Sequence, residues 1–401
     1  MEQKNSLSIW NIAAIMSAFV FSVGMMAINP AIQKLIEAYP EVRVSTIKMV
    51  STLPSLISSF VMMFVGAIVG RKIKYRTVLI LAMLCLLTGG MLPIVWNSSF
   101  SCILGARAIF GLGMGFIGCR NALIIASFPE AKRSKYLGLG VFVGNSCGVL
   151  LQIIAGWLAD IGLKQSFLVY AIALLPLALI LFFLKEPEHV QAAASANSAQ
   201  EKVQIQPKVW LYIAILFVWC TLGYSIMTNM STYIQMRGFG EAGVSGTILA
   251  LYTLGGAIAA AFSSKLYPVF KRMFIPLCFF VGALGELLVL IGANIPMIAI
   301  GTALAGAGYF CMQPQIFAFT GVVAGRTSTP LCTSIVLAAS QIGVFLSSYL
   351  CAGLGLAFDN AVVATKYCAI IGFAVIGVLF LIYDIRPAKM IQAEREAKAS
   401  K

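Results

Sequence analysis

Charge is scarce in this chain, and negative charge is the scarcest. Of its 401 residues, 10% are charged, 14 are Asp or Glu, and only one is His. Soluble globular domains carry about 25% charged residues, so the composition excludes an ordinary soluble domain. The single His and the scattered acids provide no cluster for metal binding or acid–base catalysis. We therefore expect no metal site and no enzyme activity.

Motifs for cofactors and cross-links are missing as well. The ten cysteines have no spacing typical of metal ligands or disulfides, and we expect them to be small buried apolar residues. The glycine runs at 111–115 and 138–140 lack the lysine and hydroxyl that a nucleotide-binding loop requires. The sequence therefore predicts no cofactor and no ATP site.

What the chain does contain is apolar sequence in long stretches. A transmembrane helix needs about 20 mostly apolar residues to cross a hydrocarbon core of roughly 30 Å. Twelve such stretches occur, at residues 7–29, 46–69, 77–96, 99–127, 137–159, 164–184, 209–230, 243–265, 272–292, 295–321, 330–356 and 362–384. A membrane barrel would instead show alternating stretches of about ten residues. The sequence predicts an all-α membrane protein with twelve transmembrane helices.

Lys and Arg are distributed unevenly around these stretches. With the N-terminus in the cytoplasm, 20 of the 28 lie in or beside cytoplasmic segments and 6 lie in or beside outer loops. Cytoplasmic loops of membrane proteins carry such an excess of positive charge. The net charge of +14 therefore reflects topology, and we expect no nucleic acid partner. The pattern predicts a multi-pass protein of the plasma membrane with both termini in the cytoplasm.

A change of composition divides the chain into halves. Hydropathy falls between residues 185 and 208, where Ala, Ser, Gln and Glu predominate, as is typical of a linker. The predicted organisation is an N-terminal six-helix bundle (1–184), a cytoplasmic linker (185–208) and a C-terminal six-helix bundle with a short cytoplasmic tail (209–401). A weak repeat supports it, because three residues recur 193 positions later: Gly113, Gly115 and Arg133 match Gly306, Gly308 and Arg326. Duplicated six-helix halves are expected of a secondary transporter.

The loop after the second stretch carries a recognisable motif. Residues 66–76 read Gly-Ala-Ile-Val-Gly-Arg-Lys-Ile-Lys-Tyr-Arg, which resembles the loop 2–3 motif of the major facilitator superfamily. That motif has an Asp where this chain has Gly70 and a Gly where it has Ile73. The resemblance implies a cytoplasmic gate whose closing contacts are altered here. The gating-loop candidates are Gly66, Arg71, Lys72, Lys74 and Arg76.

Two further segments resemble the same family. Arg107, Gly111 and Gly115 follow the spacing of its helix 4 motif, and residues 156–159 suit the end of its helix 5. The antiporter motif of helix 5 normally has Gly-Pro, whereas Gly144 is followed by Asn145 here. The resemblance covers the entire chain. It implies two pseudo-symmetric six-helix bundles and alternating access. The incomplete antiporter motif weakens a drug-antiporter interpretation.

Ionisable residues inside a span should face a cavity or a partner, because charge is costly in lipid. We expect three of them, Arg107, Arg120 and Glu286. Arg107 has a structural alternative near the outer end of its helix. Arg120 is a candidate for binding a carboxylate, because a guanidinium matches that group, or it extends to the cytoplasmic interface. Glu286 is a proton-carrier candidate, or it bonds to a neighbouring helix.

Polar side chains at helical spacing mark the expected cavity. Each has an alternative as a hydrogen bond between helices. The substrate-binding candidates are Arg120, Asn121, Asn145, Gln152, Tyr224, Thr228, Tyr309, Gln313 and Gln341, and the ion-coupling candidates are Glu286 and Arg107.

Together these features predict a secondary transporter of a small organic solute. The acid-poor interior favours an anionic or carboxylate substrate, with proton coupling or exchange. The alternatives are proton-driven efflux of lipophilic drugs and, in a different class, a membrane sensor that transports nothing. The expected partners are a small-molecule substrate, protons and the lipid bilayer, and the expected oligomeric state is a monomer.

Overall fold

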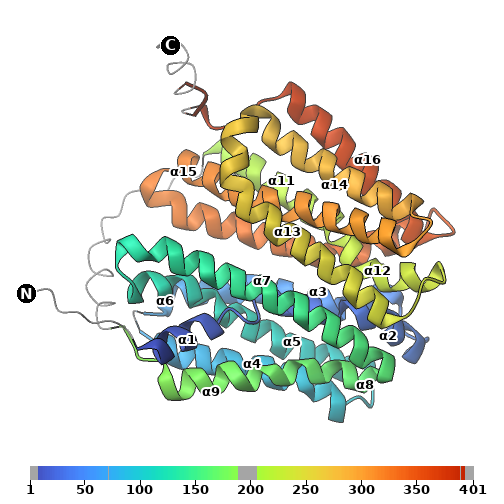
Figure 1. Ribbon diagram of the computed structural model, residues 1–401, viewed down its shortest axis with the longest axis horizontal. Coiled ribbons are helices and arrows are strands. Elements are labelled where there is room, and N and C mark those ends of the chain that lie inside the picture. Colours follow the sequence, from blue (N-terminus) through green and yellow to red (C-terminus); the bar gives the residue numbers. More distant parts are fainter. Residues whose placement is uncertain (1–7, 71, 188–205, 389, 393–401) are drawn as a thin grey trace, which may run out of the picture. The chain divides into compact units, whose positions relative to one another are not determined.

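The computed structural model of the chain describes residues 8–70, 72–187, 206–388 and 390–392 (Figure 1). Within these ranges the chain is helical and contains no strand, apart from one isolated bridge between Val69 and Ile73. Clustering of contacts gives two compact units. The first comprises residues 1–199 with 240–250, and the second comprises 200–239 with 251–401. The predicted bundle boundaries remain predictions.

The first unit is built from short and long helices. Its α-helices are α1 (Ile9–Ser17), α2 (Ile32–Ala38), α3 (Val44–Ile68), α4 (Tyr75–Val95), α5 (Phe100–Phe116), α6 (Arg120–Ser127), α7 (Glu130–Ile161), α8 (Leu163–Ser166) and α9 (Leu174–Phe183). Three 3₁₀ segments lie between them: η1 (Gly24–Ala31), η2 (Ile117–Cys119) and η3 (Phe167–Ala173). Figure 1 shows α4 and α9 side by side, and the two helices are in contact.

The second unit has longer helices. They are α11 (Pro207–Gly223), α12 (Ser225–Met236), α13 (Ala242–Phe270), α14 (Phe274–Ile291), α15 (Ile295–Leu354) and α16 (Ala361–Ile382), with the 3₁₀ turn η4 (Lys271–Met273) between α13 and α14. The first residues of α13, up to Ala250, group with the first unit. Helix α15 contains two apolar segments, Ile295–Ala324 and Cys332–Leu354. Both α11 and α14 pack along α15.

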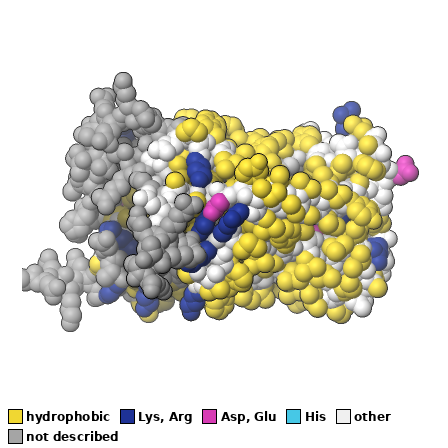
Figure 2. Space-filling model, turned by 90° about the horizontal axis from the view of Figure 1, so that it is seen from above, with side chains coloured by type: hydrophobic (Ala, Val, Ile, Leu, Met, Phe, Trp, Pro, Cys, Tyr) yellow, Lys and Arg dark blue, Asp and Glu magenta, His cyan; other side chains and the backbone are white. Residues whose placement is uncertain are grey.

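The helices expose apolar side chains to a degree that only lipid tolerates. Phe182 and Val95 are 78% and 87% exposed. Figure 2 shows a face on which hydrophobic side chains predominate, while Lys and Arg gather mainly toward one end. In the described chain, ten helical segments are long and apolar enough to cross a membrane. The predicted all-α membrane fold is confirmed.

The number of crossings remains a prediction. The first predicted span, 7–29, is not among the ten segments because the chain there is divided into α1, a turn and η1. The segment Ala242–Ile291 contains both α13 and α14, and its 50 residues are more than twice what a single crossing needs. Twelve crossings would result if the first stretch spans the membrane and this segment crosses twice.

Glycine permits the tightest helix contacts of the second unit. A Cβ atom at Gly306 of α15 would lie 2.0 Å from the carbonyl oxygen of Tyr252 in α13. A Cβ at Gly285 of α14 would lie 2.3 Å from the backbone nitrogen of Ala305 in α15. Only hydrogen fits at these two positions, so the backbones of α13, α14 and α15 approach directly.

The loop between α3 and α4 is fixed by an acid from the end of the same unit. Gly70 has φ +78°, a left-handed conformation that glycine adopts readily, and its N–H donates to the carbonyl of Ile73 (2.8 Å). The Glu186 carboxylate accepts from the backbone N–H groups of Tyr75 (2.7 Å) and Arg76 (3.0 Å). A carboxylate is stabilised at a helix N-terminus, so Glu186 caps α4.

Candidate substrate site

Three of the predicted spans are interrupted helices, and two of these carry candidate residues. The turn at residues 18–23 separates α1 from η1, η2 separates α5 from α6, and Tyr224 separates α11 from α12. Short 3₁₀ stretches inside helices often mark functional hinges. Transporters form their binding sites from discontinuous helices of this kind. The interruptions therefore mark where a substrate site is expected in each unit.

Arg120 is the first residue of α6, directly after the 3₁₀ stretch. Its side chain is half-buried, and its guanidinium carbon lies 5.1 Å from the centre of the Phe19 ring in the turn after α1. The Nε atom is buried and has no hydrogen-bond partner among the described residues. Arg120 therefore combines a cation, an aromatic face and a free donor, which together can bind a planar anion.

Helix α7 approaches the Phe19 turn closely. A Cβ atom at Gly140 would lie 2.7 Å from the Phe19 ring, and one at Gly144 would lie 2.4 Å from the hydroxyl of Ser22. The predicted residue Asn145 follows Gly144 and is half-buried. The structure thus brings Phe19, Arg120 and the Gly140–Gly144 segment of α7 to one place in the first unit.

Arg107 occupies a different environment. The side chain is fully buried in α5, and its Nε donates to the carbonyl oxygen of Val50 in α3 (2.8 Å). Its guanidinium carbon lies 4.2 Å from the ring centre of Phe110 and 5.0 Å from that of Tyr170. Among described residues it forms no ion pair with a carboxylate. These contacts join α3, α5 and η3, which suits the structural alternative.

The second unit brings several predicted residues together beside the break at Tyr224. The Tyr309 hydroxyl donates to the Cys220 thiol (3.3 Å), and the Gln313 amide lies 3.9 Å from the same sulfur. The Tyr252 hydroxyl donates to the carbonyl of Gly223 (3.3 Å), and its ring centre lies 5.7 Å from that of Tyr309. This tyrosine cluster supplies aromatic faces and hydroxyl groups, which can bind a polar organic solute.

The remaining candidates are more dispersed. Gln152 is buried in α7 and its amide donates to the Gly148 carbonyl (3.1 Å), whereas Asn121 is exposed. Thr228 is buried and donates to the Ser225 carbonyl (3.2 Å) within its own helix. Gln341 is half-buried in α15. These positions stay predictions for substrate contact.

The gating-loop candidates lie around α4. Lys72 and Lys74 are exposed, as is Gly66 near the end of α3. Arg76 donates to the carbonyl oxygen of Leu181 in α9 (2.5 Å). Arg71 lies outside the described residues. The cationic loop is therefore partly fixed to its own unit, and its gating role stays a prediction.

Glu286 has a partner that the sequence did not reveal. Its carboxylate in α14 lies 3.6 Å from the ammonium of Lys366 in α16, and both side chains are buried. The Lys366 nitrogen also lies 4.6 Å from the ring centre of Tyr233 in α12. The Tyr233 hydroxyl donates to the Val289 carbonyl (3.0 Å), and the guanidinium of Arg237 donates to that hydroxyl (2.9 Å). The pair thus belongs to a network that joins α12, α14 and α16.

The expectation of three embedded ionisable residues was wrong. Lys48 in α3 and Lys366 in α16 are both almost completely buried. They were overlooked because each lies only a few residues inside its predicted span, where a lysine normally extends to the interface. Asn29 in η1 was also missed, although both of its amide atoms are buried without a hydrogen-bond partner in the described chain.

Comparison with known proteins gives the family. The family model described as Major Facilitator Superfamily matches residues 14–275, which is more than half of the chain. This chain belongs to the Major Facilitator Superfamily. No curated protein matches its sequence. As a superfamily member it is an integral, multi-pass membrane transporter, and its family and fold indicate a transporter and not an enzyme.

Solved structures share the superfamily fold at low identity. A bacterial homologue of the human lysosomal transporter Spinster, inward-facing and unoccupied, matches with a TM-score of 0.67 and 14% identity over 93% of this chain and 94% of that chain. A D-xylose–proton symporter matches with 0.71 and 12%, over 94% and 97%. An auto-inhibited POT family peptide transporter matches with 0.68 and 13%, over 94% and 99%. At these identities the similarity shows the fold alone.

Proposed function

We propose that this transporter carries a small organic anion, bearing a carboxylate or a similar group, across the cell membrane by alternating access. The observation that supports it is the charge inside the first unit. Lys48, Arg107 and Arg120 are buried or half-buried within its helices. The acids of this unit with described side chains lie at helix ends or in loops, at Glu37, Glu41, Asp160, Glu186 and Glu241.

Cations within the first unit, whose interior has no carboxylate among the described side chains, favour an anion for electrostatic reasons. Buried charges need a partner, because desolvation of an unpaired ion is expensive. Arg120 is the best placed of the three cations, because it is half-buried and its Nε has no partner in the described chain, whereas Arg107 is fully buried and its Nε donates to the Val50 carbonyl. A substrate carboxylate would complete its hydrogen bonds. The polar residues around Tyr309 are a separate candidate for substrate contact within the second unit.

We further propose that transport is coupled to protons or proceeds by exchange, with Glu286 as the group that binds the proton. The carboxylate is buried beside Lys366. Uptake of a proton by Glu286 would remove the charge that balances Lys366, so the network with Tyr233 would have two electrostatic states. Such a two-state element is what coupling requires.

The substrate class can be tested on purified protein. A thermal-shift screen over organic anions, amino acids, sugars and cationic dyes would identify a stabilising compound, and counterflow in liposomes would measure its apparent affinity. We expect an organic anion to stabilise the protein. For Arg120→Gln, the apparent affinity for that anion should fall about tenfold or more, because a hydrogen bond to a charged group contributes about 1.5–3 kcal/mol.

Two controls sharpen this test. Arg120→Lys keeps the charge and removes the planar fork, so it should have an intermediate effect. Lys132→Gln removes an exposed cation of the same unit and should leave the affinity unchanged. Unchanged affinity of Arg120→Gln for every acidic substrate would refute the anion site. Stabilisation by cationic dyes alone would favour drug efflux instead.

A further inference from the structure

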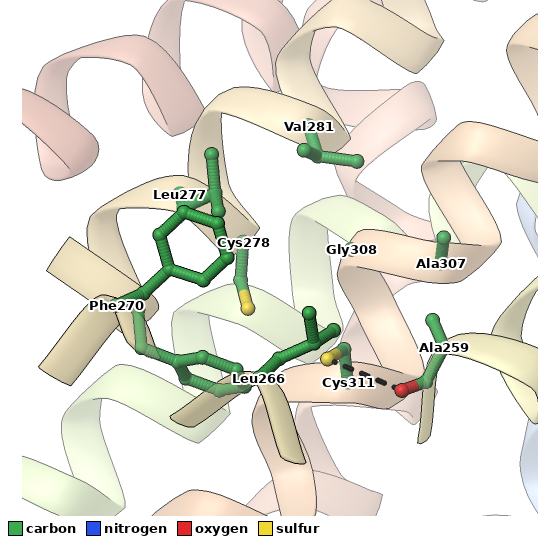
Figure 3. A pocket seen from close by; sticks show the side chains of 10 residues that line it. Ala259, Leu266, Phe270, Leu277, Cys278, Val281, Ala307, Gly308 and Cys311 are labelled. Carbon is green, nitrogen blue, oxygen red and sulfur yellow. Dashed lines mark hydrogen bonds between the residues drawn. The ribbon is translucent and has the colours of Figure 1, made fainter. Parts of the chain in front are cut away.

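The second unit contains an apolar groove that the transport site does not use. It lies between α13, α14 and α15 and has a cavity volume of about 180 Å³. Its lining has no polar surface and includes Leu266 and Phe270 of α13, Leu277 and Cys278 of α14, and Ala307 and Cys311 of α15 (Figure 3). All three helices belong to segments that are apolar enough to cross a membrane.

The groove opens to the outside of the helices. Leu266, Phe270 and Leu277 line it and are 37%, 39% and 37% exposed. In a membrane, apolar side chains exposed on a spanning helix face hydrocarbon and not water. Figure 3 shows the Phe270 and Leu266 side chains on one side of the space, with the Cys278 and Cys311 sulfurs directed toward it. The environment inside the groove therefore suits an alkyl chain.

Positive charge surrounds the end of the groove where α13 turns into α14. Two exposed lysines are next in sequence to lining residues, Lys265 beside Leu266 and Lys271 beside Phe270. Arg272 follows Lys271 and is also exposed. The sequence contains no acid between Glu241 and Glu286. Among the described residues, Asp384 is an acid that interacts with Arg272, but it is itself bound to Arg386 (2.7 Å). A net positive charge therefore remains beside the apolar groove.

We propose that this groove is a binding site for an anionic phospholipid. One acyl chain fills the space between α13, α14 and α15, and the phosphate lies at Lys265 and Lys271. Arg272 is less available because it donates to the carbonyls of Leu381 and Ile382 at the end of α16 (2.6 and 3.1 Å). Basic residues at the end of a spanning segment attract anionic headgroups, and the adjacent groove gives the bound lipid a fixed position.

The location can be tested without any variant. Wild-type protein in detergent would be mixed with phosphatidylglycerol that carries a photoreactive group in its acyl chain, irradiated, and digested for mass spectrometry. We expect the label on peptides containing residues 259–281 or 307–311, and competition by unlabelled phosphatidylglycerol but not by phosphatidylethanolamine. Labelling distributed evenly over the spans, or equal competition by both lipids, would overturn the proposal.

Variants test the two halves of the site separately. In native mass spectrometry of delipidated protein, Lys265→Gln with Lys271→Gln should lower phosphatidylglycerol affinity about tenfold. Ala307→Leu fills the groove and should also weaken phosphatidylglycerol binding, although both lysines remain. The matched control, Lys132→Gln with Lys135→Gln, removes two exposed lysines of α7 and should leave the affinity unchanged. An equal loss in this control would show that only the overall positive charge attracts lipid.

Discussion

At the scale of the residue, the pair of Glu286 and Lys366 is the least exposed ion pair among the described residues. Each side chain is nearly inaccessible, and the ammonium lies 3.6 Å from the carboxylate. Removing one member of such a pair leaves an uncompensated buried charge and typically costs about 3–5 kcal/mol. Removing both charges together is often close to neutral. A variant of either residue alone is therefore expected to lose more stability than the double variant, and transport measurements are needed to identify a proton carrier.

We therefore predict the behaviour of three variants. Glu286→Gln and Lys366→Met should each lower the thermal unfolding temperature, and the double variant should recover most of the loss. If Glu286 carries the proton, the double variant should keep substrate counterflow but lose accumulation driven by a pH gradient. Full pH-driven accumulation in Glu286→Gln would contradict the proton-carrier role and leave the pair with a structural one.

A second ion pair lies at the surface of the first unit. Lys34 in α2 lies 2.5 Å from the carboxylate of Glu241, just before α13, and both side chains are partly exposed. The Asp160 carboxylate of α7 accepts from the backbone N–H of Gly243 (2.9 Å). These contacts fix the start of α13. The hydrogen bond to Glu241 raises the pKa of Lys34 above its ordinary value.

Because its pKa is raised, the Lys34 amine should remain protonated to a higher pH than a free lysine, and the ion pair should be lost only as the pH rises through that value. We predict that Glu241→Gln increases the rate of Lys34 acetylation several-fold at about pH 9, where only the neutral amine reacts. Peptide mass spectrometry would measure the rate, with exposed Lys164 as the internal control. Equal rates with and without Glu241 would show that the pair does not form in solution.

The sequence predicted Arg107, Arg120 and Glu286 as embedded charges because they lie far inside apolar stretches. It could not predict the partner of Glu286, because a contact between α14 and α16 has no local signal in either helix. It assigned different roles to the two arginines, ion coupling or a structural role for Arg107 and substrate binding for Arg120, but it could not predict what surrounds them. Both guanidinium groups lie over aromatic rings and have buried donors without a partner in the described chain, but Arg107 is fully buried and donates to the Val50 carbonyl, whereas Arg120 is half-buried.

At the scale of the element, glycines determine how closely α13, α14 and α15 pack. We predict that Gly306→Ala destabilises the protein by about 1–3 kcal/mol, because its Cβ would overlap the Tyr252 carbonyl and force the helices apart. A Cβ atom at Gly353 of the same helix would meet no described atom within 4 Å, so Gly353→Ala is the matched control. It should be neutral or slightly stabilising. Equal thermal unfolding of the two variants would contradict tight packing at Gly306.

Element positions were predictable from apolar length, whereas helix interruptions were not. The stretch 7–29 satisfied the length criterion, but the structure divides it at residues 18–23. Tyr224 interrupts the stretch 209–230 in the same way. The hydropathy of a segment is the same whether its helix is continuous or broken. It therefore predicts where a segment lies but not whether its helix is interrupted. Phe19 lies beside Arg120 at the first of these interruptions, and Tyr309 lies beside the interruption at Tyr224.

At the scale of the whole molecule, topology follows from the distribution of Lys and Arg. We predict that a fluorescent protein fused after Lys401 matures in the cytoplasm, and that alkaline phosphatase fused at Asn97 is active outside. Both outcomes are expected because positive charges remain on the cytoplasmic side. Termini on opposite sides of the membrane would show an odd number of crossings and refute the twelve-helix arrangement.

The superfamily fold was predictable because lipid restricts a spanning chain to few architectures, and because the loop 2–3 motif has a recognisable spacing. The substrate was not predictable to the same extent. A few side chains on a shared scaffold determine what a carrier binds. Gly70 illustrates the difference. The missing Asp was evident from the sequence, but the capping of α4 by Glu186 depends on a residue more than 100 positions away.

The positive charge of Arg107 also affects which ions can enter the transporter. A guanidinium stays protonated in proteins, so the inside of the first unit carries a permanent positive potential. An arginine in a pore raises an electrostatic barrier to cations. We therefore expect the charge of Arg107 to disfavour entry of sodium and potassium into this half of the protein. A carrier protected in this way would not leak sodium or potassium while its cargo crosses.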